Sequence, residues 1–262
     1  MAKLIGPWGF TGSLGGITAY TLRESDKIIL RTTWGPSSHD IATKPAYDIT
    51  RRNNREFGGR STAAKWIRRS IQPLHAVINF NSSGPLTALL KPIQELDTES
   101  EFGKRHVLLS KRPFLLEGFN FNTRYFFDSV IRNSVKAAVS KTVPEASVAF
   151  PELLPGINFF PPESYSCYRL VVVLGLVPDV YYKNEMYRPD NVYTNHFPVQ
   201  SRSDWYTVAK GSPSLNFELR LPTNLAREDY SLVLSAGVEM GTTPGSTGAV
   251  RYHGCGKIIM VR

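Results

Sequence analysis

The second half of the chain alternates short β-favouring runs with prolines and glycines, beginning at Pro144. Several short strands separated by turn signals are typical of an antiparallel sandwich or barrel. We therefore predict an immunoglobulin-like antiparallel β-sandwich over residues 144–262. The predicted strands are residues 147–153, 167–176, 179–183, 205–209, 215–221, 230–238 and 257–261.

The first half has a different pattern, which opens with extended structure. β-Favouring runs at 14–22 and 27–34 flank the polar turn 23–26 and predict a hairpin. A two-stranded hairpin is only marginally stable alone, so it must pack on something. Upstream, glycines recur at every third position, which suits an extended arm lying close against another surface. The candidate assembly-arm residues are Gly6, Gly9, Gly12 and Gly15.

Helical patterns follow the hairpin. Thr43 and Pro45 mark the start of a helix that continues to about Glu56 and is broken or strained at Gly58 and Gly59. A second and a third helix are predicted downstream, and together with the hairpin and sandwich they define an α+β fold. The boundary between the two halves gives domains 1–143 and 144–262.

The second predicted helix, residues 61–80, has apolar residues at spacings of three and four, which places them on one face. Pro73 should kink this helix because it removes one backbone hydrogen bond and crowds the preceding turn. The third predicted helix, residues 123–140, has a similar apolar spacing. The apolar face of the second helix comprises Ala64, Ile67, Ile71, Leu74 and Ile78.

Positive charge is concentrated in one segment. The chain has a net charge of +9, and residues 44–72 carry eight Lys and Arg against two Asp and Glu, so this segment supplies +6. Such a segment can make salt-dependent contacts with phosphate backbones, with Tyr47, Phe57 and Trp66 available for stacking. Alternatively, these charges form a solvated helix face or pair across a subunit interface. The candidate polyanion-binding residues are Arg51, Arg52, Arg55, Arg60, Lys65, Arg68 and Arg69.

Several stretches occur in a recognisable order. They are the Gly-rich stretch 9–16 (GFTGSLGG), the helix start at 44–45 (KP), and then 143–148 (VPEASV), 153–156 (LLPG), 217–222 (FELRLP) and 230–235 (YSLVLS). This order resembles an uncharacterised family of proteins of similar length from the Bacteroidota. The sequence departs from the family pattern at Gly58 and Gly59 and in the loop 187–203. The resemblance implies the architecture, and it implies no activity and no catalytic residues.

The motifs of common catalytic sites are not found in the sequence. There is no G-x-x-x-x-G-K-[ST] phosphate loop, no G-x-S-x-G nucleophile turn and no G-x-G-x-x-G dinucleotide fingerprint. The five histidines lack the spacing of a metal site. Cys167 and Cys255 are expected to be free thiols with no neighbouring base to activate them. We therefore predict that the protein is not an enzyme and uses no metal or cofactor.

Four carboxylates alternate along one stretch, at Glu95, Asp97, Glu99 and Glu101. On a strand they would share one face, where they could collect a divalent cation. No glycine or further ligand accompanies them at calcium-loop spacing, so a solvated acidic loop is expected. Another alternative is that they pair with the basic segment of a neighbouring subunit.

The predicted function is that of a structural subunit of a larger particle, such as a virion or another bacterial assembly. Its partners would be copies of itself or other subunits. The first alternative is nucleic-acid binding through residues 44–72, and the second is carbohydrate or protein binding by the sandwich. The aromatic residues available for this last function are Tyr181, Tyr182, Tyr187, Tyr193, Trp205 and Tyr206.

Membrane insertion is not expected. The N-terminal residues form no apolar leader, and the longest apolar run, residues 170–177, is far short of the ~20 residues that span a bilayer. We therefore expect no secretory signal. The protein is expected to be cytoplasmic as synthesised or to be part of a particle.

Overall fold

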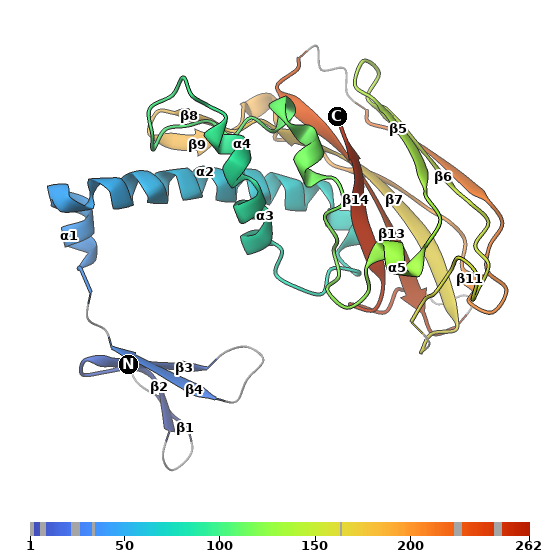
Figure 1. The fold of residues 1–262 in the computed structure, drawn as a ribbon, viewed down its shortest axis with the longest axis horizontal. Coiled ribbons are helices and arrows are strands. Elements are labelled where there is room, and N and C mark those ends of the chain that lie inside the picture. The colour runs from blue at the N-terminus through green and yellow to red at the C-terminus, as the bar shows by residue number, and fades with distance from the viewer. Residues whose placement is uncertain are drawn as a thin grey trace. The chain divides into compact units, whose positions relative to one another are not determined.

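The computed structural model describes residues 3–5, 9–21, 27–32, 35–162, 164–222, 227–243 and 248–262. The chain forms two compact units, Met1–Arg51 and Arg52–Arg262 (Figure 1). Helices and antiparallel sheets are both present, which confirms the predicted α+β class. Gly6 and the predicted turn 23–26 lie outside the described residues.

The first unit is built on a four-stranded antiparallel sheet with the order β1-β2-β3-β4. The predicted hairpin is confirmed as the pair β3–β4, and two further strands precede it. After the sheet come a short capped helix and a single 3₁₀ turn. The elements are β1 (Lys3–Ile5), β2 (Gly9–Leu14), β3 (Ile17–Thr21), β4 (Ile28–Thr32), α1 (Ser38–Thr43) and η1 (Pro45–Tyr47).

The described part of the predicted glycine arm is a strand of this sheet and not a separate extended segment. Gly9 and Gly12 lie in β2, and Gly15 with Gly16 forms the two-residue turn between β2 and β3. Gly15 has φ +57°, a conformation that a hairpin turn requires and that glycine adopts without a steric penalty. The periodic glycines therefore mark strand and turn positions.

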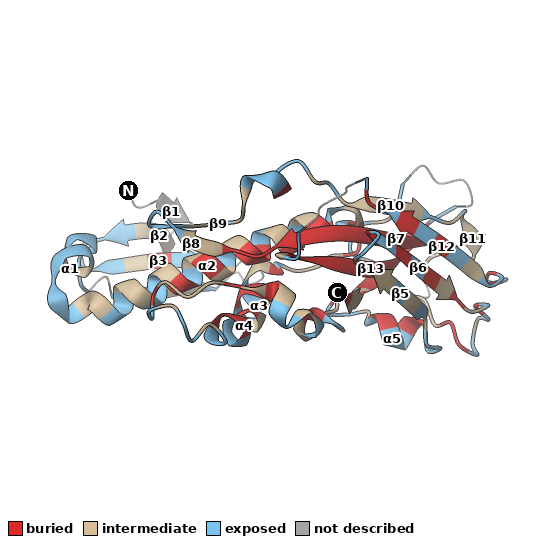
Figure 2. Cartoon of the chain, turned by 90° about the horizontal axis from the view of Figure 1, so that it is seen from above, coloured by how far each residue is buried: buried red, intermediate tan, exposed pale blue. Residues whose placement is uncertain are grey.

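The second unit is organised around two long central strands, β7 (Cys167–Pro178) and β13 (Tyr230–Gly241), which pair along their whole length. Nearly all their residues are buried, because both faces of this pair are covered (Figure 2). β10 (Val199–Arg202) and β11 (Tyr206–Thr207) pair with the free edge of β7, and β14 (Cys255–Val261) pairs with β13.

A three-stranded sheet covers one face of this central sheet. Its order is β12-β6-β5, with bounds Leu215–Arg220, Glu145–Phe150 and Lys136–Ser140. Alternate residues of β7 and β13 point into the core that the two sheets share. These packed antiparallel sheets agree with the predicted sandwich, while its immunoglobulin-like connectivity stays a prediction. A small hairpin, β8 (Tyr181–Lys183) and β9 (Met186–Arg188), follows β7.

Helices cover the other face. The remaining residues of β7, including Val171 and Val173, pack against Ile67 and Ile71 of the helical layer in a second core. This layer explains why β7 and β13 have continuous apolar sequences and no alternation of apolar and polar residues. Its elements are α2 (Asp48–Ser70), η2 (Gln72–Leu74), α3 (Ser83–Leu89), α4 (Lys91–Glu95), η3 (Leu109–Lys111) and η4 (Pro113–Leu116).

α2 is one continuous helix of 23 residues, so the predicted break at Gly58 and Gly59 is wrong. Gly59 is buried, and a Cβ there would lie 2.7 Å from the ring of Tyr187. The Tyr187 hydroxyl donates to the Arg105 carbonyl at 3.0 Å, which holds the ring against the helix. Gly59 thus serves close packing, and tertiary contacts outweigh its low helix propensity. The helix α2 ends before Pro73 is reached. Pro73 lies in the 3₁₀ turn η2, so the predicted kink within a helix does not occur.

We expect Gly58→Ala and Gly59→Ala to change stability in opposite directions. A Cβ at Gly58 meets nothing within 4 Å, so alanine should stabilise α2 by up to about 1 kcal/mol through helix propensity. The same change at Gly59 should cost about 1–3 kcal/mol because the new methyl group collides with the Tyr187 ring. Urea denaturation of both variants measures the difference, and equal effects would contradict the packing role of Gly59.

The helix predicted over residues 123–140 is also wrong. Only α5 (Phe127–Val130) is helical there, and β5 begins at Lys136. β5 pairs with β6 in a hairpin that contains the predicted domain boundary at Val143/Pro144. That position therefore lies inside one sheet, and the compact units divide at Arg51/Arg52.

Among the described residues, no helix is long and apolar enough to cross a membrane.

Candidate assembly surface

One face of the N-terminal sheet is apolar. In antiparallel strands, directly opposed residues share a face, and the register pairs Leu14 with Ile17 and Ala19 with Leu30. Alternation along β4 adds Ile28 to the same side. We call these five residues the apolar face. It is neutral as well, because the other positions that the β2–β3 and β3–β4 registers place on this side are Gly12, Thr21 and Thr32.

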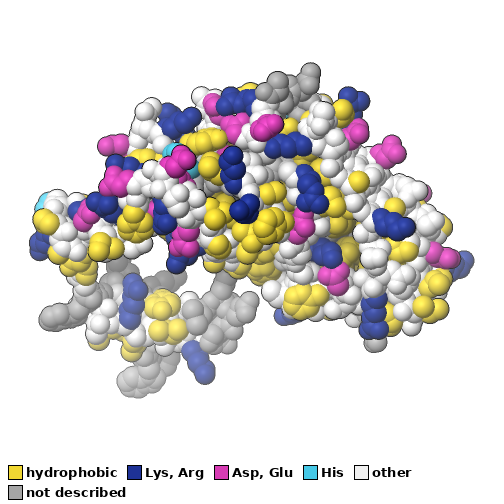
Figure 3. Space-filling view, turned by 45° about the horizontal axis from the view of Figure 1, so that its top comes forward, with side chains coloured by type: hydrophobic (Ala, Val, Ile, Leu, Met, Phe, Trp, Pro, Cys, Tyr) yellow, Lys and Arg dark blue, Asp and Glu magenta, His cyan; other side chains and the backbone are white. Residues whose placement is uncertain are grey.

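The apolar face is largely open. Leu14 is 63% exposed, Leu30 60% and Ile17 43%, and Ala19 is the only buried residue among those of the first unit whose burial the structure describes. The space-filling view shows hydrophobic side chains at the surface of this unit (Figure 3). A sheet is stable when its apolar face packs against a second layer. The exposed face is therefore the main unsatisfied feature of the unit.

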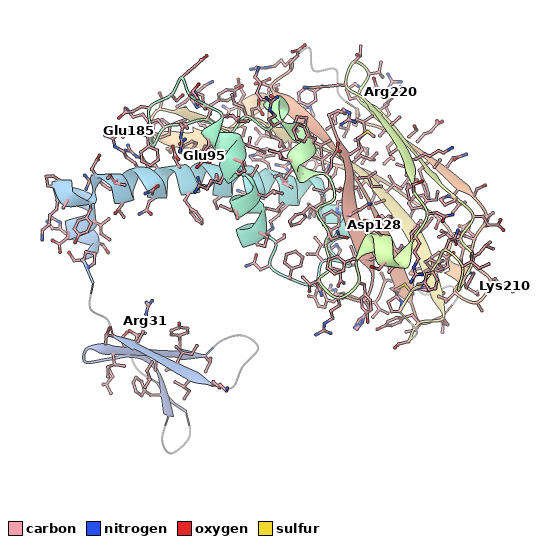
Figure 4. The ribbon with its side chains drawn as sticks, viewed as in Figure 1. Arg31, Glu95, Asp128, Glu185, Lys210 and Arg220 are labelled. Atoms are coloured by element: carbon pink, nitrogen blue, oxygen red, sulfur yellow. The ribbon has the colours of Figure 1, made fainter. Side chains whose placement is uncertain are left out.

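The opposite face of the sheet is more polar. Ser13 and Thr18 are cross-strand neighbours whose hydroxyls are hydrogen-bonded at 2.9 Å. Arg31 follows Leu30 on β4 and projects away from the sheet (Figure 4). Tyr20, 40% exposed, lies on this side too. The two faces thus differ as expected of a sheet that has one face in contact with water and the other packed against a second layer.

Most arginines of the basic segment 44–72 make contacts within their own chain. Arg51 Nη1 donates to the carbonyls of Ile41 and Lys44 at 2.8 and 2.9 Å, which ties α1 and η1 to the start of α2. Arg69 Nη2 donates to the Thr194 carbonyl at 2.7 Å, and its guanidinium lies 4.7 Å from the centre of the Phe197 ring. Arg69 therefore anchors the 187–203 loop on α2.

Two more arginines of this segment, Arg52 and Arg60, are engaged in the same way. Arg52 Nη1 lies 2.9 Å from a Glu101 carboxylate oxygen, and Arg60 Nη1 donates to Gln94 Oε1 at 2.8 Å. Arg55 differs, because its Nε atom is buried and has no hydrogen-bond partner among the described residues. The acidic stretch thus contacts the basic segment of its own chain through Glu101, while its pairing with a neighbouring subunit stays a prediction.

Lys65 and Arg68 differ from the others because both are exposed. With Ser83 they line a hollow of about 300 Å³, in which Arg68 Nη1 donates to Ser83 Oγ at 2.9 Å. Duplex-binding proteins with strong salt dependence make roughly 6–10 phosphate contacts. Two exposed cations at one hollow are a small fraction of that number, so the described geometry gives limited support to nucleic-acid binding.

The other carboxylates of the acidic stretch do not gather on one face. Asp97 accepts hydrogen bonds from the backbone N–H groups of Glu99, Ser100 and His106 at 3.1, 3.0 and 2.7 Å. Burial tends to raise the pKa of Asp97, but these hydrogen bonds outweigh it and hold the pKa below its ordinary value. Asp97 is therefore a loop-ordering residue. In the described residues, no group of three or more His, Cys, Asp or Glu is placed to hold a metal.

A polar network lies where β7 ends and β13 begins. Burial raises the pKa of Asp179, which accepts hydrogen bonds from the Ser110 backbone N–H and hydroxyl. Tyr193 donates to Asp229, and Arg227 bridges Asp229 at 3.1 Å and Asp190 at 2.9 Å. These groups satisfy one another and connect the segment after β9 to the start of β13, which is a structural role.

The two cysteines and the aromatic residues also have structural positions. Cys167 and Cys255 are buried free thiols, and burial raises the pKa of both. Neither is a thiolate at neutral pH, so neither is prepared for nucleophilic chemistry. Among the aromatic candidates, Tyr193 is fully buried and Trp205 lies 4.6 Å from the Arg169 guanidinium. The rings of Tyr182 and Tyr187 pack together with centroids 5.0 Å apart.

The sequence did not identify the apolar face because the glycines in β2 obscured its alternation. Leu14, Ile17 and Ala19 were visible as β-favouring residues, and the Gly15–Gly16 pair was the signal for the turn that brings them together. The chain matches no model of a known protein family, no curated protein and no solved structure, so the geometry alone supports a function.

Proposed function

We propose that the chain is a non-enzymatic structural subunit that assembles into a larger particle through its N-terminal unit. The particle is of the kind represented by a virion or another bacterial assembly. The observation that carries the proposal is the open apolar face, with Leu14 and Leu30 each more than half exposed. A sheet of this size with one buried side chain in its described residues lacks a core of its own, so docking supplies the missing layer.

The second unit supports the proposal in a different way. It has two continuous cores, one on each side of β7 and β13, and needs no partner to bury its apolar strands. Its buried carboxylate Asp179, whose pKa burial raises, is hydrogen-bonded to Ser110 of the same chain. A self-sufficient body combined with a small unit that is not self-sufficient is the arrangement expected of a subunit that contributes one docking element.

We expect Ile17→Asp to remove the chain from its particle and Tyr20→Asp to leave it there. Ile17 and Tyr20 are on the same strand and are 43% and 40% exposed, but they lie on opposite faces of the sheet. A carboxylate on the apolar face would be buried without a partner on docking, which is strongly unfavourable. Size-exclusion chromatography of extracts from the cells that naturally produce the chain gives the mass of the species containing it.

Circular dichroism and urea denaturation of both variants serve as the folding control, because the second unit has its own core. Loss of the large species in both variants would contradict a role specific to the apolar face. Wild-type chain that elutes as a single chain from those extracts would contradict the assembly function itself.

A further inference from the structure

The apolar face restricts the chemistry of its partner. In the described parts of β2, β3 and β4, no charged residue occupies a strand position on this side. Arg31 of β4 lies on the opposite side of the sheet. A partner presenting acidic or basic groups here would leave them desolvated and unpaired. The complementary surface is therefore uncharged, apolar and nearly flat, with about the dimensions of a small sheet.

The chain itself carries such a surface. We propose, resting on the assembly function above, that the apolar face binds the same face of a second copy of the chain. Two identical faces related by a two-fold axis are complementary in charge because each is neutral, and in hydrophobicity because each presents Leu14, Ile17 and Leu30. The pair then forms two stacked layers, which is the arrangement that sheets adopt in sandwiches.

Net charge favours this surface over others for contact between copies. Each chain carries +9, so two copies repel one another in most orientations. Contact through the apolar face brings no like charges directly together. It follows that self-association strengthens with added salt, since salt screens the repulsion and does not weaken apolar contact. Binding to a nucleic acid responds in the opposite direction.

The small size of the face limits the affinity that one contact can reach. The three strands that carry the face, each about five residues long, present on the order of 250 Å² per copy, which is below the roughly 800 Å² per partner of a standard interface. An isolated pair is therefore weak, with a dissociation constant on the order of 10–100 µM. Each chain has this face once, so the two-fold contact closes a pair, and a larger particle needs contacts through other surfaces as well.

Sedimentation velocity of the purified full chain, from about 1 to about 200 µM, measures the self-association. We expect a concentration-dependent dimer that is stronger at about 500 mM than at about 50 mM NaCl. Ile17→Asp should weaken it about tenfold or more, because two like charges meet in one small interface, while Tyr20→Asp should leave it unchanged. Mixing Ile17→Asp chains with Ile17→Lys chains should restore association above that of either variant alone.

A wild-type chain that stays monomeric at every concentration and salt would overturn the second-copy assignment. If Ile17→Asp nevertheless removes the chain from its large species in cell extracts, the assembly function stands with a different partner. If the chain also elutes as a single chain from those extracts, both proposals fail. Association that requires DNA or RNA and weakens with salt would replace this assignment by nucleic-acid binding.

Discussion

Arg105→Ala should lower the free energy of unfolding by about 3 kcal/mol at pH 7, because it leaves a buried carboxylate without its partner. Glu56 on α2 is 2% exposed, and Arg105 contacts both its oxygens, with Nε to Oε1 at 2.6 Å and Nη2 to Oε2 at 2.7 Å. The backbone N–H of Gly103 donates to Oε1 at 2.9 Å. Glu56→Gln, which keeps an acceptor, should cost only about 1–2 kcal/mol.

The difference in unfolding free energy between the wild type and Arg105→Ala should depend on pH. Burial alone raises the pKa of Glu56, but the hydrogen bonds from Arg105 and Gly103 outweigh burial and hold the pKa below its ordinary value. The stabilisation by Glu56 is thus complete above about pH 5 and is lost as the pH falls through its folded-state pKa. In Arg105→Ala the pKa rises instead, because burial then dominates. The stability gap between wild type and variant should therefore narrow between about pH 6 and pH 3.

Urea denaturation at several pH values measures this gap. Lys104→Ala is the matched control, since it removes a cation one position away whose partner, Glu101, is exposed. Its denaturation midpoint should stay close to that of the wild type. If Lys104→Ala destabilises the protein as much as Arg105→Ala, or if the gap does not change with pH, the buried pair is not the cause.

Gly175→Ala should also destabilise the second unit by about 3 kcal/mol, at the upper end of overpacking costs. Gly175 lies in β7, and a Cβ there would be 2.5 Å from Ser70 Cβ and 2.6 Å from the Ser70 carbonyl oxygen on α2. The backbones of α2 and β7 are therefore in direct contact at this point. The methyl group of an alanine at position 175 would force α2 away from β7.

The double variant Gly175→Ala/Ser70→Gly tests whether the backbone itself is in contact. Removing the Ser70 side chain leaves its carbonyl oxygen and Cα, at 2.6 and 2.7 Å from the added Cβ, so stability should not recover. Full recovery in urea denaturation would show that only the side chain matters. Gly84→Ala, where a Cβ meets nothing within 4 Å, is the control for replacing a glycine.

The central strands could be predicted from sequence because they are buried on both faces. Residues 170–177 are almost entirely apolar, and such a run indicates a strand whatever its neighbours are. The helical face around Ile67 and Ile71 was also predictable, since its spacing is that of a helix. In both cases the local pattern and the tertiary structure agree.

Other elements depend on information that lies far away in the chain. Val135, Ala137 and Val139 fit an alternating strand as well as a helix, and pairing with β6 decides for the strand. The partner of Arg69 is the Thr194 carbonyl, 125 positions away, so its charge alone could not reveal a structural role. The resemblance to the Bacteroidota family stays a prediction, and it bears on architecture only.

The pairing of β7 with β13 also has a consequence for synthesis on the ribosome. β7 is complete while residues 179–229 and all of β13 are still to be made. During that interval a strand rich in valine and leucine, with Arg169 as its one charged residue, is exposed, and the same strand of another nascent chain can pair with it. Productive folding thus competes with aggregation, which grows with chain concentration, so the risk of misfolding is greatest before β13 emerges.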